Sequence, residues 1–289
     1  MVAYVGRENF FKGLNSYLTK HAYGNARLED LLAELEAASG RDMAAWTKVW
    51  VEEPGVTTLR PEIEVDDDGN VVSLDVVQEA TTPGTSLRPH ALIVAGYSLG
   101  EDGSAERVFE QELDVDGART PVTGLVGKPR PGLILVNDQD LAYAKVRMDQ
   151  DSQDFAVQNI AKFSDALTRR VLISSAWDMT RDGELAATAF LHLALEDLTV
   201  EDNISTLAHL LGQIDQAVVA YTAPANRGAR MAWVADRVLA LAKGAAAGSD
   251  AQRLFVQSLA RRAVSAEQYA YLEALSKGTE VLEGLEMDL

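Results

Sequence analysis

The chain has 289 residues, a length at which one hydrophobic core usually gives way to two or three structural units. Its 44 acidic and 26 basic residues give a formal net charge of -18, which repels phosphate backbones and anionic lipid and argues against nucleic acid as a partner. Without cysteine, the chain cannot form disulfides, thiolate nucleophiles or cysteine-ligated metal clusters, and a cytoplasmic location is expected.

The first 52 residues are predicted to form short helices. One apolar helix face is carried by Phe10, Phe11, Leu14, Tyr17 and Leu18, and a second by Leu28, Leu31, Leu32 and Leu35. Gly40 provides a stop for the second helix, and Asp42 can cap a third that carries Trp46 and Trp50. Because ~50 residues bury too little surface to fold alone, these helices are expected to belong to something larger.

Residues 53–149 change to an apolar period of two, which predicts strands. The predicted strands lie at 59–65, 72–76, 91–99, 108–115, 133–136 and 142–148, with turns at 68–69, 100–103 and 116–117. Six or seven short strands without an intervening helix predict a small antiparallel β-sandwich.

Residues 150–289 return to helical periodicity, with breaks predicted at 180–183, 199, 222–228, 244–249 and 265. Ser249 with Gln252 and Ser265 with Gln268 have the spacing of capping boxes. Consecutive helices with short links predict stacked helical pairs, an incomplete α-helical superhelix of the HEAT-like type, although no fixed-period repeat occurs.

The four histidines are the first candidates for catalysis or metal binding: His21, His90, His192 and His209. A zinc-peptidase helix needs His-Glu-x-x-His, so that two imidazoles four residues apart face one metal ion. His21 precedes Ala22 and His192 precedes Leu193, so the motif is absent. No catalytic or metal-binding residue is therefore predicted, and each histidine is expected to be structural or exposed.

Three further motifs are interpreted as ordinary turns and loops. Ser98 lies in Gly96-Tyr97-Ser98-Leu99-Gly100, which has the spacing of a Gly-x-Ser-x-Gly nucleophile elbow, but it is discounted as part of the predicted strand at 91–99. Residues 124–129 only resemble a phosphate-binding loop, because Pro129 stands where a serine or threonine would contact magnesium. Residues 66–69 lack the alternating ligands of a calcium loop and are expected to form a hairpin turn.

Two patterns leave alternatives open. Glu110, Glu112, Asp114 and Asp138 could supply a carboxylate pair for hydrolysis, but spacing along a strand cannot show that two of them face one groove. Trp46 and Trp50 favour core packing on one helix, with a peptide-stacking surface as the alternative. Tyr269 and Tyr271 do not share a helix face.

Three stretches resemble the aminopeptidase N family of zinc metallopeptidases, of the gluzincin class, and particularly its actinobacterial members. The first begins with VGRENFFKGL at 5–14, continues through HAYGNA at 21–26 and SGRD at 39–42, and runs on to Trp46, Trp50 and PGV at 54–56. The others are LVNDQDLAYAKVR at 135–147, and WDM at 177–179 with DGE at 182–184. They are similar to the last helices of the thermolysin-like catalytic domain, the end of a β-sandwich and the start of a C-terminal helical domain.

The resemblance implies domains at 1–52 (terminal catalytic-domain helices), 53–149 (β-sandwich) and 150–289 (the N-terminal part of the helical domain). It implies a parent enzyme that removes N-terminal residues from peptides, with zinc held by His-Glu-x-x-His and a later glutamate. In the family these residues precede the segment that matches Met1 onward, so no catalytic residue carries over, and Tyr4, Tyr17 and Tyr23 do not take the role of the oxyanion tyrosine. Substrate-binding residues stay unknown.

Both ends of the chain are therefore expected to be internal to a longer protein, with no cofactor in this segment and zinc in the parent enzyme. The implied role is to brace the catalytic domain and to gate access to its active site, with peptides as substrates and neither nucleic acid nor membrane as a partner. The alternative is a free-standing interaction protein with a peptide-binding α-solenoid surface. A coding frame upstream that contains His-Glu-x-x-His would decide between them.

Overall fold

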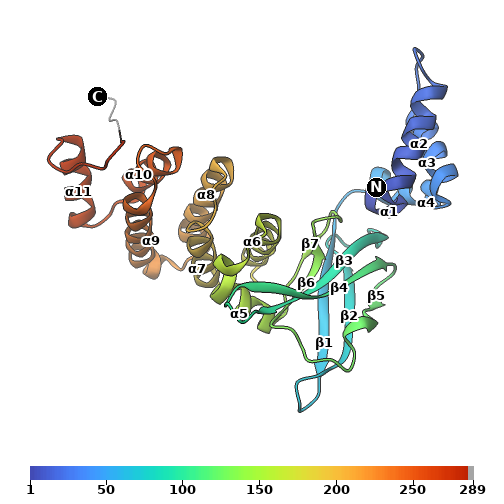
Figure 1. Cartoon of the computed structure of the whole chain (residues 1–289), viewed down its shortest axis with the longest axis horizontal. Helices are drawn as coiled ribbons and strands as arrows, with labels where there is room; N and C mark the ends of the chain where they lie inside the picture. Colours follow the sequence, from blue (N-terminus) through green and yellow to red (C-terminus); the bar gives the residue numbers. More distant parts are fainter. Residues whose placement is uncertain (286–289) are drawn as a thin grey trace. The chain divides into compact units, whose positions relative to one another are not determined.

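The computed structural model describes residues 1–285, and the chain divides into two compact units, Met1–Asp154 and Phe155–Leu289 (Figure 1). Among the described residues, the first unit contains short helices and the strands, and the second is helical. The predicted combination of a β-sandwich and a following helical part is confirmed. None of the helices within residues 1–285 has an apolar segment long enough to span a membrane.

The first unit begins with helices α1 (Val2–Val5), α2 (Arg7–Lys20), α3 (Leu28–Ser39) and α4 (Met43–Thr47), followed by a π-helical turn η1 (Lys48–Glu52). The three predicted helices are confirmed, and α1 is additional. Helix α3 ends at Gly40 in the left-handed conformation, and the Asp42 side chain accepts a hydrogen bond from the Ala45 amide at 2.8 Å. Gly13 lets α2 and α3 approach closely, because a Cβ there would lie 2.9 Å from the Glu34 carbonyl oxygen.

The sandwich consists of two sheets, with strand orders β5-β2-β1-β7 and β4-β3-β6. The strands are β1 (Thr57–Val65), β2 (Val71–Ala80), β3 (His90–Leu99), β4 (Ala105–Val115), β5 (Arg119–Pro121), β6 (Leu133–Asp138) and β7 (Lys145–Val146), with a 3-10 turn η2 (Thr123–Leu125) before β6. Apolar side chains from both sheets form one core that includes Leu59, Val76, Val94 and Ile134. The period-two pattern thus predicted most of the buried faces, but Val72, at the start of the predicted strand 72–76, is exposed and Val71 is buried instead.

The last predicted strand is shorter than expected and pairs differently. Only Lys145 and Val146 join a sheet, and they pair with β1 in parallel, whereas the other pairings are antiparallel. The reason lies in the turn after β6, where Asn137 has a positive φ of 64° and its side chain bonds both the amide and the carbonyl of Ala142 at 2.8 Å. This clasp bends residues 139–142 away from any ladder. Strand β5 was not predicted because it spans only three residues.

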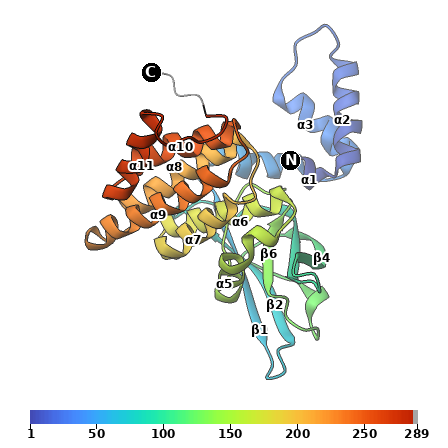
Figure 2. The same ribbon diagram turned by 60° about the vertical axis from the view of Figure 1, so that its left-hand side comes forward.

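The second unit begins within α5 (Gln150–Asn159), which the division at Asp154 crosses, and continues through the 3-10 turn η3 (Ile160–Lys162). The helices that follow are α6 (Ala166–Arg181), α7 (Ala187–Asp197), α8 (Ile204–Ala220), α9 (Pro224–Gly244), α10 (Asp250–Arg262) and α11 (Ala266–Ser276). Neighbours in the sequence from α6 to α10 pack on each other, and α11 packs on α9, as Figure 2 shows.

Most helix boundaries follow the predicted breaks, with one correction. The predicted break at 222–228 is wrong in its second half, because α9 begins at Pro224 and includes Gly228. Proline at the first helical position has the required φ and lacks only an amide that would have no helical partner there. Ser265 and Gln268 form the predicted reciprocal capping box, whereas Gln252 turns its side chain to the Gly248 amide instead of the Ser249 amide.

Candidate functional site

Arg88 joins the N-terminal helices to the sandwich. Its guanidinium is buried and donates hydrogen bonds to the carbonyl oxygens of Val49 at 2.8 Å, Gly55 at 2.6 Å and Glu53 at 3.0 Å. Helix ends leave carbonyl groups without partners, and the planar guanidinium has donors enough to satisfy several at once. One side chain thus fixes the path from η1 into β1.

Trp50 and His90 complete this junction, which we call the Arg88 junction. Trp50 lies 5.3 Å from the Arg88 guanidinium carbon and meets the His90 ring edge to face at 5.2 Å. The His90 Nε2 atom lies 2.9 Å from Thr57 Oγ1 and 3.2 Å from Gln78 Oε1. Its Nδ1 is buried without a hydrogen-bond partner within residues 1–285.

The charge state of His90 follows from these surroundings. Burial, and to a lesser degree the Arg88 charge, lower the pKa of His90 to about 4. A proton on Nδ1 would meet no acceptor, and the imidazole is therefore neutral at neutral pH. The junction holds its geometry through packing and neutral hydrogen bonds around one fixed cation.

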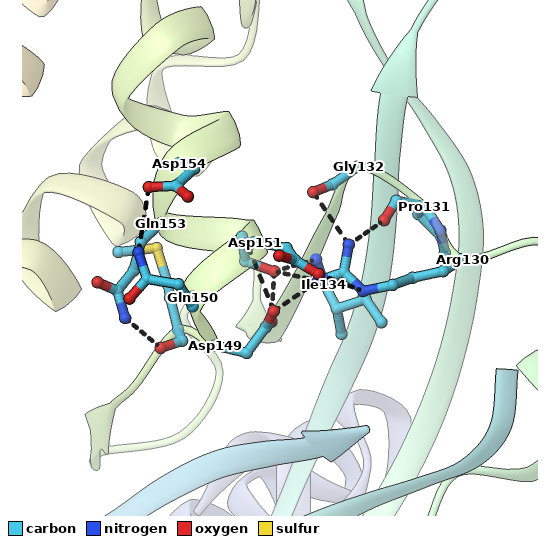
Figure 3. Close-up of polar contacts among 11 residues, drawn as sticks. Arg130, Pro131, Gly132, Ile134, Asp149, Gln150, Asp151, Gln153 and Asp154 are labelled. Atoms are coloured by element: carbon cyan, nitrogen blue, oxygen red, sulfur yellow. Dashed lines mark hydrogen bonds and ion pairs between the residues drawn. The ribbon is translucent and has the colours of Figure 1, made fainter. Parts of the chain in front are cut away.

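A second polar cluster, the Arg130 latch, fixes the start of α5 to the segment before β6 (Figure 3). Arg130 Nη2 lies 2.5 Å from Asp149 Oδ1, and Arg130 Nη1 donates to the Pro131 carbonyl at 2.7 Å. The fully buried Ser152 donates to Asp149 at 2.5 Å and accepts a hydrogen bond from the Ile134 amide at 2.9 Å. The first turn of α5 is therefore bonded to the edge of the sandwich.

The structure separates the four histidines. His90 is in the Arg88 junction, His21 ends α2 beside Tyr17, and His209 is exposed on α8. The His192 ring contacts the Trp233 ring at a centroid distance of 4.7 Å, with the two planes tilted by 50°. Within residues 1–285 no three His, Cys, Asp or Glu side chains are grouped so that they could hold a metal ion.

Three of the four acidic candidates form ion pairs with arginines. Arg107 lies 3.0 Å from Glu110 and 2.9 Å from the buried Asp138, which also accepts a hydrogen bond from Tyr97 at 3.0 Å. Asp114 pairs with Arg41 at 2.8 Å. Glu112, the remaining candidate, is exposed on β4. Structural ion pairs therefore account for three of the four carboxylates.

The remaining motifs take the places expected from the sequence. Trp46 is buried and stacks on Trp50 at 5.9 Å, which confirms core packing for this pair. Residues 66–69 form the turn between β1 and β2, and residues 124–129 form a loop before β6. Ser98 accepts a hydrogen bond from the Gly132 amide at 3.3 Å.

Arg88 and Arg130 were missed by sequence reasoning, because arginine is usually exposed and neither lies in a motif. A weak signal exists, since each precedes a proline, and a residue before proline is held in an extended conformation. Lys128 and Arg60 also precede proline, so this signal alone would not have singled them out.

Comparisons with known proteins give matches along the whole chain. A family described as "ERAP1-like C-terminal domain" matches residues 133–285. The "Aminopeptidase N" of Streptomyces lividans is 43% identical over 294 residues, covering 100% of this chain and 34% of that protein. The "Tricorn protease-interacting factor F2" of Thermoplasma volcanium is 25% identical over 70% of this chain and 23% of its own length. The chain thus spans about a third or less of these relatives.

Proposed function

Because this chain belongs to the aminopeptidase N family and corresponds to its C-terminal region, we propose that it is the non-catalytic segment of a zinc aminopeptidase that removes N-terminal residues from peptides. The observation that carries the proposal is the alignment of the entire chain with 34% of an aminopeptidase N. The side chains within residues 1–285 do not fit a zinc site, so the metal is assigned to other parts of the enzyme. A cytoplasmic location belongs to the same proposal, supported by the absence of cysteine.

The segment is proposed to brace the catalytic domain and to gate access to its active site. The Arg88 junction supports the bracing role, because a buried guanidinium bonded to four carbonyl groups fixes the helices on the sandwich. Residues 1–52 are proposed to be the terminal helices of the catalytic domain. Phe11 and Leu18 on α2 are more than half exposed and provide an apolar face for its remaining part to cover.

A direct test is an activity and metal assay of this chain. We expect no hydrolysis of aminoacyl p-nitroanilides and no stoichiometric zinc by elemental analysis, because the proposed chemistry requires residues outside the chain. Chelator-sensitive turnover by this polypeptide would overturn the proposal.

The coding region upstream of Val2 provides the second test. A continuous frame with His-Glu-x-x-His would support a longer aminopeptidase, and the longer protein would allow the bracing role to be measured. In that protein Arg88→Met should lower kcat/KM and thermal stability together, whereas Arg253→Met, at an exposed position of α10, should change neither. Equal effects of the two variants would contradict bracing by Arg88.

A further inference from the structure

The helical unit contains a pocket of about 890 Å³ that the proposed function does not use. It lies where the loop between α7 and α8 faces the end of α9 and the start of α10. Its floor is apolar, since Leu198 and Phe255 are buried there and Ala240 and Leu241 line the wall. The volume falls in the range of sites that bind small molecules and side chains of peptides.

The rim of this pocket is acidic. The Glu201 carboxylate is held in place by the amides of Asp202 at 3.0 Å and Asn203 at 2.8 Å, and it lies 3.7 Å from Arg169. Asp202 itself forms no ion pair with any residue in the described part of the chain. Its charge is therefore available to a ligand.

The basic residue in the lining does not offset this charge. Arg237 is already paired with Glu196, so its guanidinium is neutralised outside the pocket. Asp250 adds a further carboxylate to the rim, and its ion pair with Arg253 at 3.1 Å is likewise neutral in sum. The surplus of negative charge therefore comes from Asp202 and from Glu201, which shares Arg169 with Asp197. The pocket therefore combines an apolar floor with a surplus of negative charge at its mouth.

We propose that this pocket binds a peptide segment in which an apolar residue stands between basic residues. The apolar side chain would occupy the floor over Leu198 and Phe255, and a lysine or arginine beside it would lie against Asp202. An acidic or phosphorylated segment would meet like charge at the rim and in the whole chain, whose net charge is -18. Such a peptide would bind to the helical unit itself, and its binding would not require the catalytic domain.

The first experiment compares three peptides on the full chain. The probe is fluorescein-Gly-Arg-Leu-Arg-Gly-amide, followed by fluorescence anisotropy at low salt. Burial of one leucine side chain is worth ~1.5 kcal/mol or more, so replacing Leu by Ser should weaken binding at least tenfold. Replacing both arginines by glutamate should also abolish most of the binding. Equal affinity for the three peptides would overturn the proposal.

The second experiment uses exposed positions, so that the fold is preserved. Ala246 is exposed and lines the pocket, and Ala246→Trp should fill the pocket and weaken the Arg-Leu-Arg probe by about tenfold, or ~1.4 kcal/mol. Ala208→Trp, exposed on α8 and outside the lining, is its matched control. Asp202→Lys should have an effect of the same order as Ala246→Trp, and Asp67→Lys, at an exposed turn of the sandwich, is the control for charge.

Both controls should leave affinity within about twofold, a difference well under the 1.4 kcal/mol of a tenfold change. Circular dichroism establishes that each variant is folded. Retained binding in both pocket variants, or an equal loss of affinity in Asp67→Lys, would mean that the probe binds through non-specific charge attraction. Either result would overturn the proposal. Since no turnover is measured, these results stand apart from the test of the proposed function.

Discussion

At the scale of single residues, His90 is expected to make the folded state sensitive to acid. Its pKa is about 4 in the fold, against 6.5 as the ordinary value, so the unfolded chain takes up the proton first as pH falls. The stabilisation is fully present above pH ~6.5 and decreases as pH falls toward 4, by at most about 3 kcal/mol. Urea unfolding followed by tryptophan fluorescence at pH 7.5, 6 and 5 measures this loss.

His90→Gln isolates the effect from other titrating groups. Glutamine cannot protonate, so the variant is less stable at pH 7.5 because it loses packing against Trp50, but its free energy of unfolding changes less between pH 7.5 and 5. His209→Gln, at an exposed position, serves as the control with an unchanged pH dependence. An identical slope in wild type and His90→Gln would contradict the assignment.

Ser152 is the residue of the Arg130 latch whose loss is simplest to interpret. Ser152→Ala removes the acceptor of the buried Ile134 amide, and an unsatisfied buried amide costs about 1–3 kcal/mol. The free energy of unfolding should fall by that amount, as measured by urea titration. Ser276→Ala, at the exposed end of α11, should stay within about 0.5 kcal/mol of wild type. Equal stability of the two variants would mean that α5 is not anchored through Ser152.

At the scale of elements, two glycines with open surroundings should respond to alanine with opposite signs. Gly40 ends α3 with φ at +70° and Gly212 lies within α8, and a Cβ would meet no atom within 4 Å at either position. Gly40→Ala should cost about 1–2 kcal/mol through left-handed strain. Gly212→Ala should stabilise α8 by about 0.5–1 kcal/mol, because alanine loses less entropy in a helix.

Thermal unfolding of the two single variants provides the measurement. Gly40→Asn is the control for the first glycine, since asparagine tolerates this conformation better than alanine and should recover part of the stability. If the melting temperature changed in the same direction in both alanine variants, the space around the added Cβ, and not the backbone conformation, would determine the effect on stability.

The sequence predicted elements where the signal is local and failed where partners are distant. Apolar periodicity located α2, α3 and six of the strands, and the spacing of Ser265 and Gln268 located a capping box. The parallel pairing of β7 with β1 follows the Asn137 clasp, in which a turn residue bonds the backbone of Ala142. Apolar periodicity carries no information about such a contact. The Arg88 junction likewise joins carbonyl groups more than thirty residues away, beyond any local pattern.

At the scale of the whole molecule, the resemblance of three stretches predicted the family correctly, because it used residue identity in order along the chain. The domain limits at 52 and 149 stay a prediction, since the compact units divide the chain at Asp154 and helix α5 crosses that point. The acidic pocket was not foreseen, because it depends on how two helix connections face each other and not on a motif.

The net charge of -18 leads to a prediction for the complete chain. Repulsion among like charges acts over about 10 Å at 0.1 M salt and is screened as salt rises, while exposed ion pairs, which salt also weakens, contribute only about 0–1 kcal/mol each. The excess of acidic residues should therefore dominate, and the melting temperature should rise between about 20 and 300 mM NaCl.

Asp67→Lys with Asp68→Lys places two positive charges on an exposed turn, and this variant should be more stable at low salt and respond less to added salt. A melting temperature that falls with salt would show that ion pairs such as Arg119 with Asp75 outweigh the general repulsion.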